Sequence, residues 1–387
     1  MKNSISRSDF IKNVGLIGGA SIDLSFRVYV GTYTENAGPA GEKSEGIYVY
    51  RMDLKDGGLT PLSVMKGVVN PSFLAIHPNQ RFLYSVNEVG QTNDQPGGGV
   101  SAFSINPQAG ELSFLNQQLS RGADPCYVSV DATGKVALVA NYSSGSLSMF
   151  PLDPDGKLQP AVAFIQHNGS GPDPIRQAGP HVHSIVLSPD NRFALVADLG
   201  LDKVKVYQVN IREGKLVPQT HSEVQVEAGS GPRHLEFHPN GRFVYLINEL
   251  NSSLIAFNYE PVNAMLREIQ TASTLPNEFQ GNNMTADVHV VPSGKFVYGS
   301  NRGHDSIVIY AIDEENGQLT YVGHELTQGE FPRNFVIDPT GTYMFVANQN
   351  SGTIVTFRID SQTGKISPTG QVTKVPSPVC IKIIKEQ

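Results

Sequence analysis

One block pattern recurs along this chain: a short apolar run, a polar turn, a second apolar run, and a closing Asn or Asp. Short apolar runs bounded by turn residues predict β-strands. Copies that follow one another about every 50 residues are typical of the blades of a β-propeller. Six segments show the pattern: NPSFLAIHPNQRFLYSVN, DPCYVSVDATGKVALVAN, PHVHSIVLSPDNRFALVAD, GPRHLEFHPNGRFVYLIN, TADVHVVPSGKFVYGSN and FPRNFVIDPTGTYMFVAN. Their closing residues are Asn87, Asn141, Asp198, Asn248, Asn301 and Asn348.

The two ends of the chain supply a seventh copy in two parts. Near the N-terminus, FRVYVGTYT followed by GIYVYRMD matches the second half of the repeat, whereas SPVCIKII near the C-terminus matches only its innermost strand. If the last strand completes the first sheet, the ring closes and no strand edge is left unpaired. We therefore predict an all-β protein: a seven-bladed β-propeller of four-stranded antiparallel blades, formed by residues 27–387 and closed by the C-terminal strand.

Composition supports this prediction and excludes several partners. The 387 residues include 38 Gly, 25 Pro and no Trp, which suits many short strands joined by tight turns. A net charge of −7 opposes binding to nucleic acid. The 2 Cys are too few for a disulfide framework and lack metal-binding spacing. No apolar run approaches the roughly 18 residues of a membrane span, and nothing resembles an association helix, so we expect a monomer with no membrane span.

The first 26 residues form a separate leader. The stretch SRSDFIKNVGLIGGAS resembles a twin-arginine export signal, but Ser8 stands where the second Arg would be. We favour a leader that contributes nothing to the fold and a cytoplasmic protein. Export to the periplasm is the alternative.

The strand order of a propeller predicts where a functional site lies. In a four-stranded up-and-down blade, the start of the first strand and the turn between the second and third strands lie at the same end. The other end receives HPNQ, DATGK and similar turns, which have ordinary turn composition. His77 and His238 belong to these turns, and we expect them to be structural.

The repeats differ from one another at the end that holds the start of the first strand and the turn after the second strand. A repeat that diversifies toward His, Arg and Glu at one mouth of the channel indicates a site there. At the start of the first strand the copies carry Ser72, Cys126, His183, Arg233, Ala286 and Arg333. After the closing residue they carry Glu88, Tyr142, Leu199, Glu249, Arg302 and Gln349.

Structural roles compete with functional ones at several of these positions. We expect the repeated Asn or Asp to be a loop hydrogen-bonder, and Glu249 and Arg302 could be an ion pair between neighbouring blades. His181 and His183 share a strand face, but no third ligand has metal-site spacing, so we expect no metal. His289 lies deeper in its strand and is as well explained by a hydrogen bond in the channel. Cys126 would be a nucleophile only beside an imidazole, and we expect a buried, unreactive thiol.

Several longer motifs resemble a known family. VYVGTYT, GPHVHSIVLSPDNRFALVADLG, GSGPRHLEFHPNGRFVYLINE and GSNRGHDSIVIY are similar to segments of the lactonase family of seven-bladed propellers. That family includes the bacterial propeller-type 6-phosphogluconolactonase and the fungal carboxy-muconate cyclase. The resemblance runs from about Arg27 to the C-terminus.

The resemblance implies an activity and a set of site residues. It implies hydrolysis of a sugar lactone, above all 6-phosphogluconolactone to 6-phosphogluconate in the pentose phosphate pathway, without a metal or cofactor. Matched by motif, the catalytic group would be His183 in PHVH, Arg233 in GPRH, Glu249 in INEL and Arg302 in SNRG, with His181 as the alternative for the His position. All lie on the mouth predicted above. The substrate-binding candidates are His181, His234, His289, Arg333 and Glu88.

These residue types suit the opening of an internal ester. His183 or Glu249 could serve as base and acid, Arg233 and Arg302 could stabilise the oxyanion, and a guanidinium such as that of Arg333 could clamp a phosphate or carboxylate. The substrate would be a small anionic lactone. Two alternatives remain: a lactonase or cyclase for another lactone, of aldonolactone or muconate type, and a noncatalytic propeller that binds a ligand at the same mouth.

Overall fold

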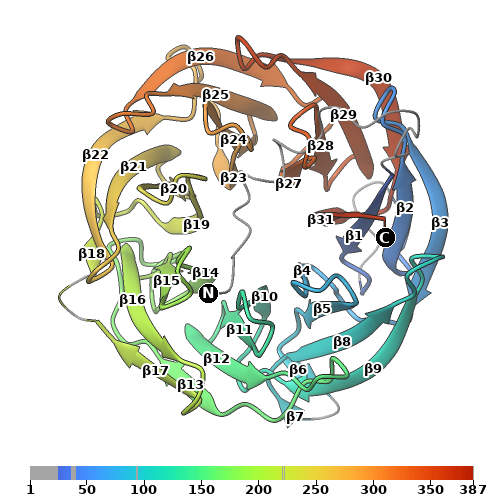
Figure 1. The fold of residues 1–387 in the computed structure, drawn as a ribbon. Helices are drawn as coiled ribbons and strands as arrows, with labels where there is room; N and C mark the ends of the chain where they lie inside the picture. The colour runs from blue at the N-terminus through green and yellow to red at the C-terminus, as the bar shows by residue number, and fades with distance from the viewer. Residues whose placement is uncertain (1–24, 36–40, 93–94, 220, 222, 387) are drawn as a thin grey trace, which may run out of the picture.

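Seven antiparallel sheets stand like blades around a central axis in the computed structural model (Figure 1). The structure describes residues 25–35, 41–92, 95–219, 221 and 223–386. Within these ranges there is no α-helix, and no helix could cross a membrane. The seven-bladed propeller predicted from the repeats is confirmed.

The strands of each blade follow one another from the channel outward. The first blade contains, in this order, β31 (Pro378–Lys385), β1 (Phe26–Thr32), β2 (Gly46–Met52) and β3 (Leu59–Lys66). The second contains β4 (Leu74–Ile76), β5 (Phe82–Asn87), β8 (Gly99–Ile105) and β9 (Leu112–Leu119), with a hairpin of β6 (Gln91–Thr92) and β7 (Gln95–Pro96). The third contains β10 (Pro125–Val130), β11 (Val136–Asn141), β12 (Ser146–Pro151) and β13 (Ala163–Gln166).

The remaining blades repeat this arrangement. The fourth contains β14 (Val182–Leu187), β15 (Phe193–Asp198), β16 (Lys203–Asn210) and β17 (Lys215–Pro218), with β18 (Val224–Gln225) also paired to β16. The fifth contains β19 (Pro232–Phe237), β20 (Phe243–Asn248), β21 (Ser253–Glu260) and β22 (Met265–Ser273). The sixth contains β23 (Met284–Val290), β24 (Phe296–Arg302), β25 (Ser306–Ile312) and β26 (Leu319–Leu326). The seventh contains β27 (Pro332–Ile337), β28 (Tyr343–Asn348), β29 (Thr353–Ile359) and β30 (Ile366–Lys374).

The C-terminal strand closes the ring as predicted. β31 pairs with β1 from Phe26 opposite Lys385 to Thr32 opposite Pro378, so the first blade takes its innermost strand from the other end of the chain. Because β1 begins at Phe26, the propeller starts one residue before the predicted boundary. Of the predicted leader, residues 1–26, the structure describes Ser25 and Phe26, and residues 1–24 lie outside the described residues.

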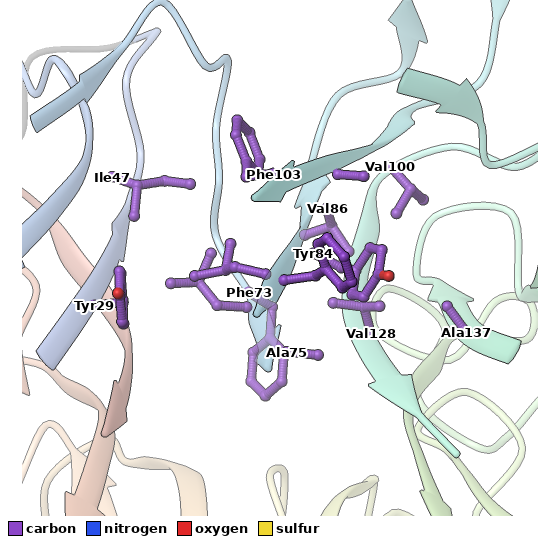
Figure 2. Close-up of a cluster of buried hydrophobic side chains, with 14 of the residues drawn as sticks. Tyr29, Ile47, Phe73, Ala75, Tyr84, Val86, Val100, Phe103, Val128 and Ala137 are labelled. Carbon is purple, nitrogen blue, oxygen red and sulfur yellow. The ribbon is translucent and has the colours of Figure 1, made fainter. Parts of the chain in front are cut away.

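The core lies between neighbouring blades. Second strands such as β20, FVYLIN, are buried along their whole length, because both faces of the sheet pack against adjacent blades. This explains why the sequence shows continuous apolar runs there rather than alternation. Figure 2 shows one such layer, with Tyr29 and Ile47 of the first blade, Phe73 and Phe103 of the second, and Val128 of the third.

Buried tyrosines connect the blades by hydrogen bonds. Each lies on a second strand and donates its hydroxyl to a backbone carbonyl in the outer turn of the next blade, which satisfies a buried polar group. The pairs are Tyr29 with Gly110, Tyr84 with Gly156, Tyr245 with Gly317, Tyr298 with Gly364 and Tyr343 with Lys55. The last pair, at 2.7 Å, joins the seventh blade to the first.

Candidate active site

A β-bulge near the start of the innermost strands aims the site residues. In several blades the pairing with the second strand skips one or two residues at this point. A bulged residue is released from the ladder and can turn its side chain away from the sheet face. The skipped residues are Cys126, His183, Arg233, Ala286 with Asp287, and Arg333. The positions at which the repeats diversify are therefore the positions that this bulge directs into the channel.

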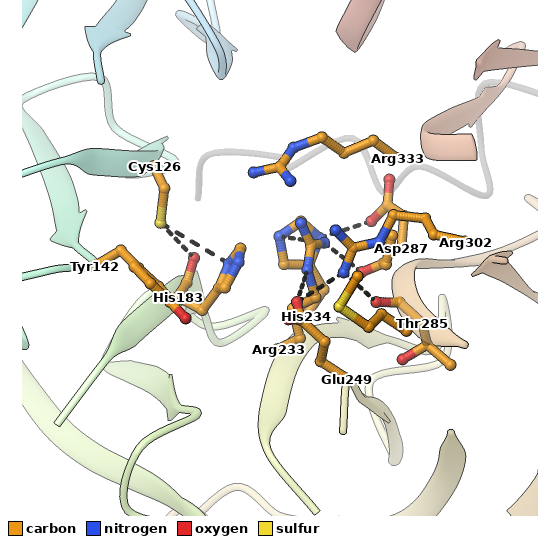
Figure 3. A network of polar contacts seen from close by, with 12 residues as sticks. Cys126, Tyr142, His183, Arg233, His234, Glu249, Thr285, Asp287, Arg302 and Arg333 are labelled. Carbon is orange, nitrogen blue, oxygen red and sulfur yellow. Dashed lines mark hydrogen bonds and ion pairs between the residues drawn. The ribbon is translucent and has the colours of Figure 1, made fainter. Parts of the chain in front are cut away.

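The bulged side chains meet at one mouth of the channel, as Figure 3 shows for Cys126, His183, Arg233 and Arg333. They surround a narrow cavity of about 10 Å³, room for about one water molecule. The residues that line it are Ser72, Phe73, Glu88, Cys126, His183, Arg233, His234, Arg333, Asn334 and Val379. Five of the predicted site residues thus line one cavity: Glu88, His183, Arg233, His234 and Arg333.

A wider hollow of about 460 Å³ lies away from the axis. Its described lining comes from the ends of β3 and from β8 and β9, with Phe103, Phe114 and Gln117 on its walls. No predicted site residue lines it. The channel mouth therefore remains the candidate site.

Glu249 is clamped by guanidinium groups beside the cavity. Its Oε2 accepts hydrogen bonds from Nε of Arg233 at 2.9 Å and from Nη2 of Arg302 at 2.8 Å. Its Oε1 accepts one from Arg176. Burial by itself would raise the pKa of Glu249, but the surrounding guanidinium groups outweigh it and hold the pKa well below its usual value. The predicted ion pair of Glu249 with Arg302 is present, within a larger cluster.

Arg176 is a further candidate site residue, which the sequence interpretation missed. It lies in the connection between β13 and β14, outside the repeat, where the chain reads NGSGPDPIRQAGP. Besides Glu249, it contacts the hydroxyl of Tyr142 at 3.3 Å and Sδ of Met284 at 3.5 Å. An arginine in an unusually long connection on the functional side of the ring was the one available signal.

Arg333, on β27, lines the same cavity as Arg233. Its guanidinium lies over the ring of Tyr33, and its Nη2 is 3.0 Å from the Tyr33 hydroxyl. That hydroxyl donates to Glu88 at 2.9 Å. Among the described residues, no carboxylate lies within 4.0 Å of Arg333 to form an ion pair. Arg333 is thus a half-buried cation that can bind an anion.

His183 and His181 both lie against Tyr142. The ring of Tyr142 stacks on His181 at 4.5 Å between centroids and meets His183 edge-on at 5.4 Å. Burial, reinforced by the charge of Arg233, lowers the pKa of His183 well below its usual value, so the ring is neutral. Its Nδ1 is 3.8 Å from Sγ of Cys126. Burial raises the pKa of that thiol, which agrees with the expected unreactive cysteine.

A second polar layer lies deeper in the channel. Nδ1 of His234 is 2.8 Å from Oδ1 of Asp287, whose other oxygen contacts Asn334 and, at 3.2 Å, Nε2 of His289. His289 also contacts Glu236. His289 therefore lies in this layer rather than in the cavity lining. Asp287 was not predicted, although the residue beside a diversified position in TADVH could have indicated it.

The residues interpreted as structural keep that role in the structure. The side chain of Asn301 donates to the carbonyl of Thr274 at 2.7 Å, and similar bonds hold Asn87, Asn141 and Asn348 to the connections before their blades. At the far mouth, His77 and His238 contact the carbonyls of Gly134 and Gly294. In the described part of the chain, no group of three His, Cys, Asp or Glu side chains could hold a metal ion.

Fold and mouth together define a propeller with a small, strongly cationic cavity and buried imidazoles, which is typical of an enzyme that acts on a small anion. Comparison with known proteins supports this class. The family described as "Lactonase, 7-bladed beta-propeller" matches residues 27–383. The chain belongs to this family.

Curated and solved relatives cover most of the chain. A Bacillus subtilis protein named 6-phosphogluconolactonase is 38% identical over 360 residues, covering 92% of this chain and 98% of the relative. A Formosa agariphila protein of the same name is 38% identical over 314 residues, 80% of this chain and 86% of the relative. The structure of a Pseudomonas aeruginosa periplasmic gluconolactonase superposes with a TM-score of 0.87 at 37% identity, covering 94% of this chain and 100% of that structure.

Proposed function

We propose that this protein hydrolyses a sugar lactone, 6-phosphogluconolactone, to 6-phosphogluconate, as part of carbohydrate metabolism. Two relatives at 38% identity bear the name of this activity. The observation that carries the proposal is the charge of the channel mouth.

The mouth has more positive than negative side chains. Arg176, Arg233, Arg302 and Arg333 carry four formal positive charges there, and Glu88 and Glu249 carry two negative ones. The excess is two positive charges. A phosphate monoester carries roughly −1.5 to −2 at neutral pH. A phosphorylated lactone therefore matches the charge that the cavity leaves uncompensated, whereas a neutral lactone does not.

The geometry favours distinct roles for Arg233 and Arg333. Arg233 lines the cavity and is held by Glu249, so its guanidinium is preorganised to stabilise the oxyanion that forms on the lactone carbonyl. Burial lowers the pKa of Arg302 to about 9, which still leaves it charged at neutral pH. Arg333 has no carboxylate partner among the described residues and offers two donors to a phosphate. Glu249 has both oxygens bonded to guanidinium groups, so it positions them and is a poor base.

An unphosphorylated aldonolactone is the second candidate, because the Pseudomonas aeruginosa relative is named a periplasmic gluconolactonase. The two candidates differ in location as well. A sugar phosphate does not cross a bilayer, since burying its charge costs too much, so the first candidate places the protein in the cytoplasm. A periplasmic protein would fit the second. A muconate-type lactone and noncatalytic binding remain the weaker alternatives.

A pair of substrates tests the proposal. Hydrolysis of 6-phosphogluconolactone and glucono-δ-lactone is measured by proton release, with the spontaneous rate subtracted. We expect faster turnover of the phosphorylated lactone, and we expect Arg333→Met to raise its KM at least tenfold while changing that of glucono-δ-lactone about twofold. Arg81→Met, at an exposed turn of the far mouth, is the matched control and should change neither.

The other outcomes would favour one of the alternative functions. Equal turnover of both lactones, unaffected by Arg333→Met, would favour the aldonolactone. Binding of either compound without turnover would favour a noncatalytic propeller. A chelator should leave the rate of hydrolysis unchanged. Loss of activity on chelation would contradict metal-independent hydrolysis.

A further inference from the structure

Both oxygens of Glu88, which also lines the cavity, accept hydrogen bonds from Tyr33 and Ser72. Three other groups at the mouth could take a proton from water: Glu249, His183 and His234. Glu249 is already bonded through both oxygens to guanidinium groups. His183 has no carboxylate partner among the described residues, and its Nδ1 faces the Cys126 thiol at 3.8 Å. Of the three, His234 is the one that pairs with a carboxylate, because its Nδ1 is 2.8 Å from Oδ1 of Asp287.

The contacts of His234 fix its tautomer. The Asp287 carboxylate can only accept, so Nδ1 of His234 carries a proton and donates it. On the other side of the ring, Nε2 is 3.3 Å from Nη1 of Arg233, which can only donate. Nε2 therefore carries the lone pair. A ring oriented by a carboxylate through one nitrogen, with a lone pair on the other, is the usual arrangement of a general base.

The lone pair lies beside the group that would stabilise the product of attack. His234 and Arg233 both line the cavity, and Nε2 and Nη1 are neighbours at its wall. A water held by Nε2 would lie next to the guanidinium that stabilises the oxyanion. The deeper layer keeps the base in place, because Asp287 is itself held by Asn334 and His289.

We propose that His234 is the general base of lactone hydrolysis and that Asp287 is the residue that positions it. This rests on the proposed function. It gives His234, which we expected only to bind substrate, the role that the motif comparison assigned to His183 or Glu249.

The reaction balances with these groups alone. A proton of water passes to Nε2 of His234 while the water oxygen bonds to the carbonyl carbon, and the carbonyl electron pair moves to the oxygen facing Arg233. The oxyanion then re-forms the C=O bond, the bond from this carbon to the ring oxygen breaks, and the ring oxygen takes the proton from the imidazolium. The hydroxy acid that results ionises and releases one proton.

Charged and titratable groups face His234 from several elements. Burial, with the charge of Arg233, lowers its pKa to about 4, against the raising effect of Asp287. The ring is therefore neutral at neutral pH, with its Nε2 lone pair free of a proton, and activity should fall only in acid. The groups around it are Arg233 on its own strand, Asp287 and His289 on β23, His183 on β14 and Tyr127 on β10.

Single substitutions test the assignment. The rate of 6-phosphogluconolactone hydrolysis, or of whichever lactone the wild type turns over faster, is measured for His234→Gln, His183→Gln and Asp287→Asn. We expect His234→Gln to lower kcat at least a hundredfold with little change in KM, and His183→Gln to lower it less than tenfold. His77→Gln, at the far mouth, should match the wild type. Circular dichroism and Tm establish that each variant folds.

The pH profile tests Asp287 separately from any structural role. The wild-type kcat should fall below about pH 5 with an apparent pKa near 4. In Asp287→Asn the carboxylate no longer stabilises the imidazolium, so this acid limb should move to lower pH while kcat drops at least tenfold. Loss of packing alone would lower kcat without moving the limb. If His234→Gln does not fold, the pH profiles of the wild type and of Asp287→Asn test the proposal by themselves.

The outcomes separate the two proposals. A wild type that hydrolyses neither lactone contradicts the proposed function. An active wild type whose rate survives in His234→Gln within about threefold, but is lost in His183→Gln, contradicts this inference and assigns the base to His183. An unmoved acid limb in Asp287→Asn contradicts the positioning role.

Discussion

Two buried pairs of His and Asp lie in different parts of this molecule, one between blades and one in the channel. Between the third and fourth blades, Nδ1 of His167 is 2.5 Å from Oδ2 of Asp198. In the channel, Nδ1 of His234 is 2.8 Å from Oδ1 of Asp287. Both imidazoles are almost fully buried. The two pairs differ in what the second ring nitrogen contacts.

That second contact separates a structural pair from a candidate catalytic one. Nε2 of His167 is 2.9 Å from the hydroxyl of Tyr207, so both of its nitrogens are satisfied inside the protein and the ring does not line the mouth cavity. Nε2 of His234 lies at the wall of that cavity beside Arg233. A carboxylate-paired imidazole is therefore not in itself a sign of catalysis. The partner of the other nitrogen distinguishes the pairs: a tyrosine hydroxyl between the blades for His167, and an arginine of the cavity lining for His234.

The structural pair also explains the one irregular closing residue among the repeats. At four other junctions an Asn closes the second strand and its side chain bonds the connection into its blade, as Asn301 bonds Thr274. At the junction of the third and fourth blades the closing residue is Asp198 and the connecting residue is His167. Two departures from the repeat thus occur together. The carboxylate of Asp198 stands where Asn301 has an amide, and its partner is the imidazole of His167, where Thr274 has a hydroxyl.

The largest effect is expected from Asp198→Ala. Asp198 accepts the bond from His167 and backbone N–H bonds from His181, Gly200 and Leu201, all inside the protein. Removing a buried pair's carboxylate leaves these donors unsatisfied and should cost about 3–5 kcal/mol of unfolding free energy. Urea denaturation measures it. A cost below about 1 kcal/mol would contradict the structural role.

A double-mutant cycle sharpens the comparison with the other junctions. His167→Thr and Asp198→Asn should each destabilise the protein by about 1–3 kcal/mol, because each leaves the other partner mismatched. The double variant recreates the Thr274 and Asn301 contact, in which the hydroxyl donates at 2.8 Å. Its cost should be at least about 1 kcal/mol less than the sum of the two single variants. Additive costs would mean that the two residues do not act as a pair.

The smallest effect is expected from Tyr207→Phe, which frees Nε2 of His167 without disturbing the pair. Loss of one buried hydrogen bond should cost about 0.5–1.5 kcal/mol, with lactone turnover unchanged. Tyr84→Phe, which removes a hydroxyl bonded to Gly156 at 3.0 Å, is the matched variant and should cost a similar amount. A change in kcat for Tyr207→Phe alone would mean that the interblade pair affects the site.

Much of the fold could be predicted because the information is local and repeated. Turn residues and continuous apolar runs specify each strand, and the split repeat at the two ends predicts closure by SPVCIKII. The site position followed from strand order, and the β-bulge that aims Cys126, His183, Arg233 and Arg333 acts at the positions at which the repeats diverge. The bulge itself was not predicted, since nothing in one strand reports a skipped pairing.

What the sequence by itself determined is the seven-bladed ring and the mouth that holds its unusual residues, because strand formation and strand order depend on neighbours in the chain. Only the tertiary structure decided which of these residues pair. Arg176 meets Glu249 across 73 positions, and Asp287 meets His234 across 53. Hydrogen bonds and ion pairs depend on distances of a few ångströms, and such distances between remote residues exist only once the blades have packed.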